Sequence, residues 1–283
     1  MKWENLREEE FKFAKERSGG LCILPVGCLE KHGQHLPVGT DVIIAQSVAE
    51  RAAELADAVV FPPMYFGEKC GAAEFDGTVI FTPELRQAIL KETCSEIARN
   101  GFKKILLFNA HGGNTSMLSS FARSVLYNKN DYLVYVYSVA DTGGLEIRNV
   151  LNKNYDYLTA DDIKIMEDWD AIEDKTWGHA CFMESAWTYA ACPEACDLSR
   201  MDAESGENIG RFKEFQKSGI YSPFTWMANY PNSYDGTFHP GLNSRIAKAC
   251  FDYCVETLAE RLKFLKEETI TTEYHKEWLA KQK

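Results

Sequence analysis

LPVGCLEKHGQHLPVGTD, residues 24–41, begins as an apolar run and then brings together one Glu, two His and one Asp. Glu30 and His32 are two positions apart, so they share one side of an extended chain. A proline and a glycine precede Asp41 and can turn the backbone back toward this pair. Carboxylates and imidazoles are the ligands that hold divalent transition metals. The stretch therefore predicts a metal site at the end of a buried strand.

The fold class follows from the alternation of two sequence patterns around this stretch. Short apolar runs rich in β-branched or aromatic residues cover 21–27, 58–64, 104–110 and 132–138, and helical patterns cover 41–56, 83–100 and 114–128. Alternation of this kind predicts an α/β fold with three layers, α/β/α, around a mainly parallel sheet. Ligands of such sheets bind beyond the carboxyl ends of the strands. His111, which follows the third run, is therefore expected to meet the first group of ligands.

The second half of the chain is less regular. Residues 161–174 carry seven acidic side chains among fourteen, a pattern typical of a solvated helix or loop, with a lid or subunit contact as a second possibility. We expect an ordered loop over 219–242 and an amphipathic helix over 243–267. The chain is predicted to form a single domain over 1–283. We place its motif-bearing core at about 20–200 and a C-terminal loop and helix at 219–283.

Composition excludes several classes of partner. The 283 residues carry a formal net charge of −11 with no basic cluster, which argues against binding to nucleic acid. We find no apolar window long enough to span a membrane. The N-terminus is a charged amphipathic pattern rather than a signal peptide, and the nine cysteines show no regular spacing. We therefore expect a cytoplasmic protein with reduced thiols that acts on a small molecule.

The ligand types favour a site with two metal ions. Glu30, Asp41 and His111 offer two oxygens and one nitrogen to one ion, which leaves His32 for a second ion that Asp41 can bridge. Zn²⁺, Mn²⁺ and Fe²⁺ all accept such mixed ligands. Paired ions bind water and lower its pKa toward neutrality, so the resulting hydroxide can attack an electrophilic carbon while one ion polarises its oxygen.

A third cluster, WGHACFMES (177–185), supplies His179 and Glu184. If 179–191 is helical, these two side chains point about 140° apart, so they take different roles. We expect Glu184 to complete the second metal site and His179 to handle substrate protons. The alternatives are a capping or core imidazole for His179 and, for Glu184, a buried carboxylate paired with a backbone N–H or an arginine.

The turn HGGN (111–114) is expected to bind substrate. Gly112 and Gly113 permit close backbone approach and a positive φ. The amides here, with Asn114, lie at a helix N-terminus that can hold an oxyanion or an anionic group. Our further candidates for substrate contacts are Cys28, Trp177 and His239.

Four motifs in this order and spacing resemble the creatininase (creatinine amidohydrolase) family over roughly 20–200: LPVGCLEKHGQHLPVGTD, FDGT (75–78), NAHGGN and GHACFMES. The resemblance implies one α/β/α domain, two metal ions, hydrolysis of a cyclic amide or related C–N bond, and a homo-oligomer, often a hexamer. By position, Glu30, Asp41 and His111 match the ligands of one metal, and His32 with Asp41 match those of the other. His179 matches the proton-shuttling histidine of the family.

Three departures from the family pattern concern the substrate more than the metals. Enzymes that act on creatinine have a glutamate two residues after the histidine that His111 matches, where this chain has Gly113. The HGGN version is similar to members that act on formamides, peptides, and cyclitol or sugar derivatives, so we predict a non-creatinine member in which Glu184 replaces the missing acid. Cys28 stands where serine is usual, and FDGT replaces FPGT, with Ala72 where a histidine is common.

The favoured function is therefore metal-dependent hydrolysis of a C–N amide bond, in a cyclic amide or a formamide. One alternative keeps the metals but cleaves a ring C–C bond of a keto-cyclitol or sugar-like compound. A second makes Cys28 a nucleophile with His32 or His35 as its base. A third is a metal-binding assembly protein without turnover, although few protein donors per ion leave open positions that favour catalysis.

Overall fold

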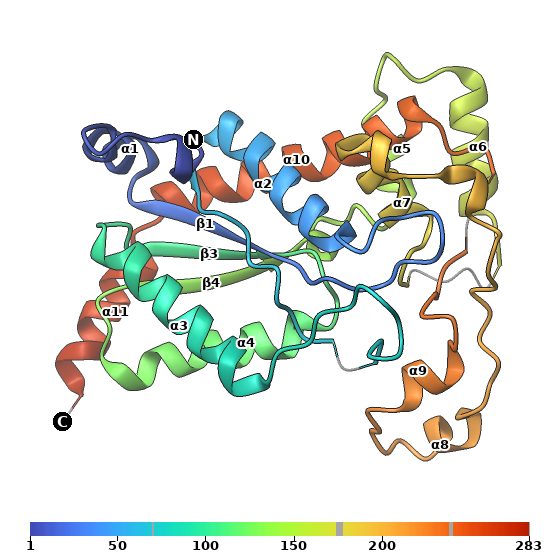
Figure 1. Cartoon of the computed structure of the whole chain (residues 1–283). Coiled ribbons are helices and arrows are strands. Elements are labelled where there is room, and N and C mark those ends of the chain that lie inside the picture. Colours follow the sequence, from blue (N-terminus) through green and yellow to red (C-terminus); the bar gives the residue numbers. More distant parts are fainter. Residues whose placement is uncertain (70, 174–177, 238–239, 283) are drawn as a thin grey trace.

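A computed structural model describes residues 1–69, 71–173, 178–237 and 240–282. Within these ranges the strands form one parallel sheet in the order β2-β1-β3-β4. The strands are β1 (Leu21–Val26), β2 (Val59–Val60), β3 (Lys104–Asn109) and β4 (Leu133–Ser138). Helices flank the sheet on both sides (Figure 1), so the predicted α/β fold with three layers, α/β/α, and a mainly parallel sheet is confirmed.

The two faces of the sheet belong to two separate hydrophobic cores. In β1, Leu21 and Ile23 pack on one face, and Cys22 and Leu24 pack on the other. All residues of β1 and β3 are buried, as expected for a sheet covered on both faces. The first face is covered by α2 (Thr40–Ala56), α7 (Phe182–Ala191) and α10 (Ser244–Glu267), and the second by α1 (Glu10–Ser18), α3 (Pro83–Arg99) and α4 (Asn114–Ser124).

The remaining helices also follow the last strand. They are α5 (Ile147–Leu151), α6 (Ala160–Asp170), α8 (Lys213–Lys217), α9 (Thr225–Asn229) and the C-terminal α11 (Ile270–Lys281). Single 3₁₀ turns cover Trp3–Asn5, Val125–Asn128, Val139–Thr142, Pro193–Ala195 and Leu198–Arg200. No helix in the described ranges has the length and apolar character needed to cross a bilayer.

Local chemistry explains where the elements agree with the predicted limits and where they differ. The Thr82 hydroxyl accepts the Leu85 N–H, and Pro83 opens α3 as predicted. The strand predicted over 58–64 is confined to Val59–Val60, because two prolines follow at 62 and 63 and lack the N–H that a ladder needs.

The irregular regions hold more helix than the sequence predicted. The segment 219–242, predicted as an ordered loop, contains α9, and its residues 238 and 239 fall outside the described ranges. The acidic stretch 161–174 is largely α6, whose Asp162, Met166 and Trp169 are buried. A fully solvated helix is therefore wrong for this stretch, since one face of α6 packs against the core.

The strand register brings two distant segments together. Val26 pairs with Asn109 at the ends of β1 and β3. Because both strands run in the same direction, the segments that begin at Gly27 and Ala110 leave the sheet side by side. This edge carries the polar motifs of the first and third strands.

Asp162 ties α6 to the start of α10. Its carboxylate accepts hydrogen bonds from Thr159 N (2.9 Å) and Thr159 Oγ1 (2.8 Å), and its own backbone N–H donates to Thr159 Oγ1 at 3.2 Å, which completes a capping box. It also accepts from Asn243 Nδ2 at 2.8 Å and from Arg245 Nε at 2.6 Å. These partners, Arg245 first, lower the pKa of Asp162 despite its burial.

We expect Asp162→Ala to lower the free energy of unfolding by about 2–4 kcal/mol, since it removes charge-assisted hydrogen bonds from a buried site. Asp161→Ala, on the exposed side of the same turn, is the control and should change it by less than about 0.5 kcal/mol. Urea titrations at neutral pH measure both values. The difference in free energy of unfolding between the wild-type protein and Asp162→Ala should persist down to about pH 4 and decrease only below it. The reason is that a carboxyl group with a lowered pKa stabilises the fold until it becomes protonated. Equal stability of the two variants would contradict the assigned role.

Candidate metal centre and active site

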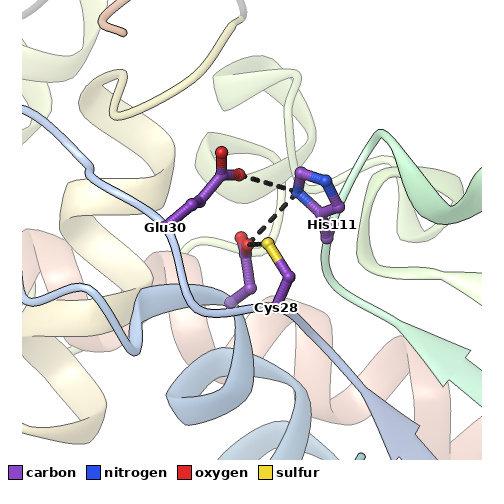
Figure 2. A group of neighbouring side chains, drawn as sticks. Cys28, Glu30 and His111 are labelled. Atoms are coloured by element: carbon purple, nitrogen blue, oxygen red, sulfur yellow. Dashed lines mark hydrogen bonds and ion pairs between the residues drawn. The ribbon is translucent and has the colours of Figure 1, made fainter. Parts of the chain in front are cut away.

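The first group of ligands lies where β1 and β3 end. Cys28, Glu30, Asp41 and His111 each offer one ligand atom, and these atoms lie within 4.8 Å of one another. His111 Nδ1 is 2.9 Å from Glu30 Oε1 and 3.2 Å from Asp41 Oδ2. Figure 2 shows Cys28, Glu30 and His111 pointing toward one another from the two loops. All four residues are buried.

The second group shares one carboxylate with the first. His32 Nε2 is 3.3 Å from Asp41 Oδ1 and 3.7 Å from Glu184 Oε2. Asp41 thus turns Oδ2 to the first group and Oδ1 to the second, the position required of a bridging ligand. It occupies the first turn of α2, where the helix dipole favours negative charge. The chain does return from Glu30 and His32 to Asp41, as the sequence predicted.

Backbone carbonyls fix the orientation of each histidine. His32 Nδ1 donates to the Glu30 carbonyl at 3.1 Å, and His111 Nε2 donates to the Glu68 carbonyl at 2.8 Å. A carbonyl only accepts, so these nitrogens carry the hydrogen. The other nitrogen of each ring faces carboxylates, and His32 Nε2 and Asp41 Oδ1 make no hydrogen bond to any described residue. A ring nitrogen that faces a carboxylate either carries a proton or shares a cation with it, and the buried, unpartnered His32 Nε2 and Asp41 Oδ1 fit a metal ion between them.

The electrostatics of the cluster agree with this fit. Burial lowers the pKa of His32 and His111, but nearby carboxylates outweigh it. Asp41 leads in raising the pKa of His32 to about 9, and Glu30 leads in raising that of His111 well above its ordinary value. Burial raises the pKa of Asp41, yet His32 and His111 hold it well below the usual range. The negative potential that attracts protons here also attracts a divalent ion.

His179 lies at the edge of both groups. Its Nε2 donates to the Lys31 carbonyl at 2.5 Å, and its Nδ1 is 3.5 Å from Glu30 Oε1. Its ring centroid is 3.9 Å from that of His32, and burial, followed by the charge of His32, lowers its pKa to about 3. His179 with Glu30 and His32 forms a third possible ligand group.

The helix expected over 179–191 begins at Phe182, so His179 precedes it. The predicted angle of about 140° between His179 and Glu184 around a helix is therefore wrong. Ala180 has φ +60 and sits between them, and its N–H donates to Glu184 Oε2 at 2.6 Å. This tight turn brings both side chains to the same cavity. Burial raises the pKa of Glu184 to about 7.

A cavity of about 510 Å³ opens beside the ligands. His111, His179 and Glu184 lie in its wall, as do the predicted Gly112 and Gly113. Gly113 has φ −61, so no positive φ is needed there. A Cβ at Gly113 would lie closer than 3.0 Å to both His111 Nε2 and the Glu68 carbonyl oxygen, so the close approach predicted for this turn is confirmed at this residue.

Other predicted substrate contacts lie elsewhere or cannot be placed. Among the described residues that line the cavity, Cys28 and Asn114 are absent. The Cys28 thiol donates to Asp41 Oδ2 at 3.1 Å, while the Asn114 amide oxygen accepts the Glu68 N–H at 2.7 Å. Trp177 and His239 lie outside the described residues. His35, near the motif, hydrogen-bonds to Ser185 Oγ at 2.9 Å and stays out of the ligand groups in the described ranges.

The sequence interpretation missed much of the cavity wall. Lys69, Trp226 and Asp235 line it, together with apolar side chains from α9 itself, from the segment before it and from the segment after β4: Val139, Leu145, Tyr221 and Met227. Lys69 is not a metal-ligand type, and a search for His, Asp and Glu after strands therefore passes over it. Only the position of 58–64 as an edge strand could have drawn attention to the residues that follow it.

Comparisons with known proteins show the family of this chain. The family model described as Creatininase, creatinine amidohydrolase, matches residues 4–262. The creatinine amidohydrolase of Pseudomonas putida is 32% identical over 108 residues, which are 36% of this chain and 42% of that protein. The mycofactocin precursor peptide peptidase of Mycolicibacterium smegmatis is 34% identical over 120 residues, which are 39% and 47% of the two chains.

A third relative is more distant. The 3-dehydro-scyllo-inosose hydrolase of Thermotoga maritima is 27% identical over 178 residues, which are 62% of this chain and 51% of that protein. The matched part of the chain thus spans about half the length of these relatives.

Solved structures share the fold at low identity. A creatininase described as its manganese form has a TM-score of 0.68 at 20% identity, covering 94% of this chain and 99% of that one. A creatininase variant of the Zn-Zn type has a TM-score of 0.69 at 20% identity, covering 94% and 98%.

The position of Asp41 between the two groups of candidate ligands provides a test of the metal site. We expect Asp41→Asn to lose both ions, because it weakens the one carboxylate that faces both groups, whereas His32→Ala and His111→Ala should each lose one ion. Asp57→Asn, at the other end of the same helix, is the control and should keep both. Metal per chain is measured by mass spectrometry after reconstitution with zinc or manganese. Two ions retained in Asp41→Asn would contradict the shared site.

Proposed function

The chain belongs to the creatininase family, and from this membership we propose that it is a metal-dependent hydrolase that cleaves a C–N amide bond in a small polar substrate. The observation that carries the proposal is Asp41, whose two oxygens face His111 on one side and His32 on the other in a buried cluster beside a cavity. We infer that two divalent ions, zinc, manganese or iron, bind here. Relatives named as zinc and manganese forms support the first two metals.

Each residue has a distinct part in the proposed reaction. Glu30, Asp41 and His111 would hold one ion, and His32, Asp41 and Glu184 the other. When bound, such ions polarise a carbonyl and lower the pKa of water. His179 would take a proton at Nδ1 from the attacking water and pass it to the leaving amine, since its Nε2–H is engaged by the Lys31 carbonyl, its Nδ1 is free to accept and its ring borders the cavity. A leaving amine needs that proton because an amide anion is a very poor leaving group.

The alternatives are less well supported. Cys28 is fully buried, and burial, followed by Asp41, raises the pKa of its thiol, so it is a poor nucleophile. The cavity beside the ligands favours turnover over a closed structural metal site. Ring-opening C–C hydrolysis of a keto-cyclitol stays a second candidate, because a relative that covers 62% of this chain is an inosose hydrolase.

Turnover of a substrate panel separates the two chemistries. Reconstituted protein is assayed on lactams, formamides and keto-cyclitols, with chelated protein and re-added metal as controls. We expect chelator-sensitive cleavage of an amide. Cleavage confined to keto-cyclitols would favour the second candidate, and equal activity after chelation would overturn both.

Glu184 is expected to act as a ligand of the second ion. Glu184→Gln should lower the occupancy of one ion selectively, because His32 and a shared Asp41 alone leave that ion weakly held. Glu194→Gln, an exposed glutamate in the turn after α7, is the matched control. Metal content and the dissociation constant of the weaker ion are the measurements. Two-metal stoichiometry unchanged in Glu184→Gln would count against the assignment.

His179 is expected to serve the proton transfer and not the metals. His179→Ala should keep both ions and the fold while turnover falls by roughly 10²–10⁴-fold, the usual scale of general acid–base catalysis. Steady-state kinetics, metal content and circular dichroism are measured on the same preparation. Loss of one ion would instead make His179 a ligand, in line with its place beside Glu30 and His32. Near-normal turnover with both ions would move the role to His239 or to a metal-bound water.

A further inference from the structure

Lys69 is a nearly buried cation in the wall of the cavity. Its Nζ is 2.6 Å from Glu30 Oε2 and lies 4.2 Å from the centroid of the Trp226 ring. Only 11% of the side chain is exposed. Among the described residues that line the cavity, no other lysine or arginine occurs. Among the described residues of the wall, Lys69 is therefore the one that brings a lysine or arginine charge beside the proposed reaction centre.

The backbone on its N-terminal side holds Lys69 firmly. Glu68 donates its N–H to the Asn114 side chain at 2.7 Å and accepts a hydrogen bond from His111 on its carbonyl at 2.8 Å. The Glu68 carboxylate pairs with the buried Arg86. Gly67 fits so closely against the Gly27 carbonyl that a Cβ would overlap it. Lys69 thus has a preorganised position and loses little freedom when it binds a ligand.

The Lys69 ammonium group has enough N–H donors to bind a second acceptor besides Glu30. Lysine has three N–H donors, and Glu30 is the ion-pair acceptor that the described residues provide. If Lys69 only neutralised Glu30, its charge would become superfluous once a divalent ion binds that carboxylate. An anion in the cavity would restore the balance, since Lys69 then stands next to a cationic centre.

We propose that Lys69 binds an anionic group of the substrate, a carboxylate in the simplest case, and so selects amides that carry a negative charge near the scissile bond. The inference rests on the proposed function only for the class of bond that is cleaved. The preference for a negatively charged ligand follows from the position of Lys69. The Trp226 ring borders the ammonium group, and its Nε1 donates to Asp235 Oδ2 at 3.2 Å. This bond fixes the ring so that the lysine and the indole form one side of the pocket.

The test measures binding independently of turnover. Zinc-reconstituted protein is titrated calorimetrically with N-formylglycine, N-formylalanine and N-formylleucine, and with the neutral carboxamide of each. We expect the acids to bind roughly 10- to 100-fold more tightly than the carboxamides, the scale of a hydrogen bond to a charged group. Lys69→Met should abolish this preference while metal content stays unchanged, and Lys69→Arg should restore part of it.

The control is Lys104→Met. Lys104 is as little exposed as Lys69 and is ion-paired with Glu268 at 3.2 Å, but it lies at the start of β3 and not among the described residues of the cavity wall, so the preference for acids should persist. Equal binding of acids and carboxamides, no binding of any acid, or a preference retained in Lys69→Met would each overturn the proposal. Cleavage of neutral amides without discrimination would leave the hydrolase proposal standing and reject this one. If acids bind in a Lys69-dependent way but are never cleaved, the anion-binding proposal stands and the hydrolase proposal is rejected.

Discussion

The rest of the site depends on neutralising the charge of two buried carboxylates. Glu30 and Asp41 are completely shielded from solvent at the carboxyl end of a parallel sheet. An unpaired buried carboxylate costs several kcal/mol or shifts its pKa until it is neutral. Here His32, His111 and Lys69 surround the pair, and the start of α2 adds its dipole at Asp41. A divalent ion completes this neutralisation better than protons do, because it can satisfy several oxygens at once.

The strand and helix layout was predictable because its signals are local. Apolar runs and helical periods stand in the sequence around 21–27, 83–100 and 104–110, and the parallel sheet follows from their alternation. The ligand group was predictable for a related reason, since parallel strands end at the same edge. The single-domain organisation and the predicted oligomer concern longer-range arrangement and remain predictions.

Features that depend on tertiary packing were beyond the sequence. The start of α7 at Phe182 depends on the left-handed Ala180, which no residue type announces, since alanine rarely adopts a positive φ. Lys69 joins the site because Glu68 is fixed to Asn114 and His111, contacts that span more than 40 positions of sequence.

The proposed metal ligands and the residues that would select the substrate come from different parts of the fold. The proposed ligands stand on strand ends and helix starts, where backbone hydrogen bonds hold them, whereas Leu145 and Tyr221 come from connecting segments and Met227 from the five-residue helix α9. Segments of this kind tolerate change more readily than the sheet does. Relatives of this chain are named for three different substrates: creatinine, a peptide precursor and an inosose.

Gly113 shows how the ligand set and the wall constrain each other. The resemblance to the creatininase family implies a glutamate here in members that act on creatinine, and a Cβ at this position would collide with the His111 ring and the Glu68 carbonyl. The segment that carries Lys69 therefore occupies the space from which that glutamate would start. Glu184 Oε2 on α7 lies 3.7 Å from His32 Nε2, which suits the proposed role of Glu184 as a ligand of the second ion. On that proposal, the close packing of the Lys69 segment against His111 and the use of a carboxylate from α7 depend on each other.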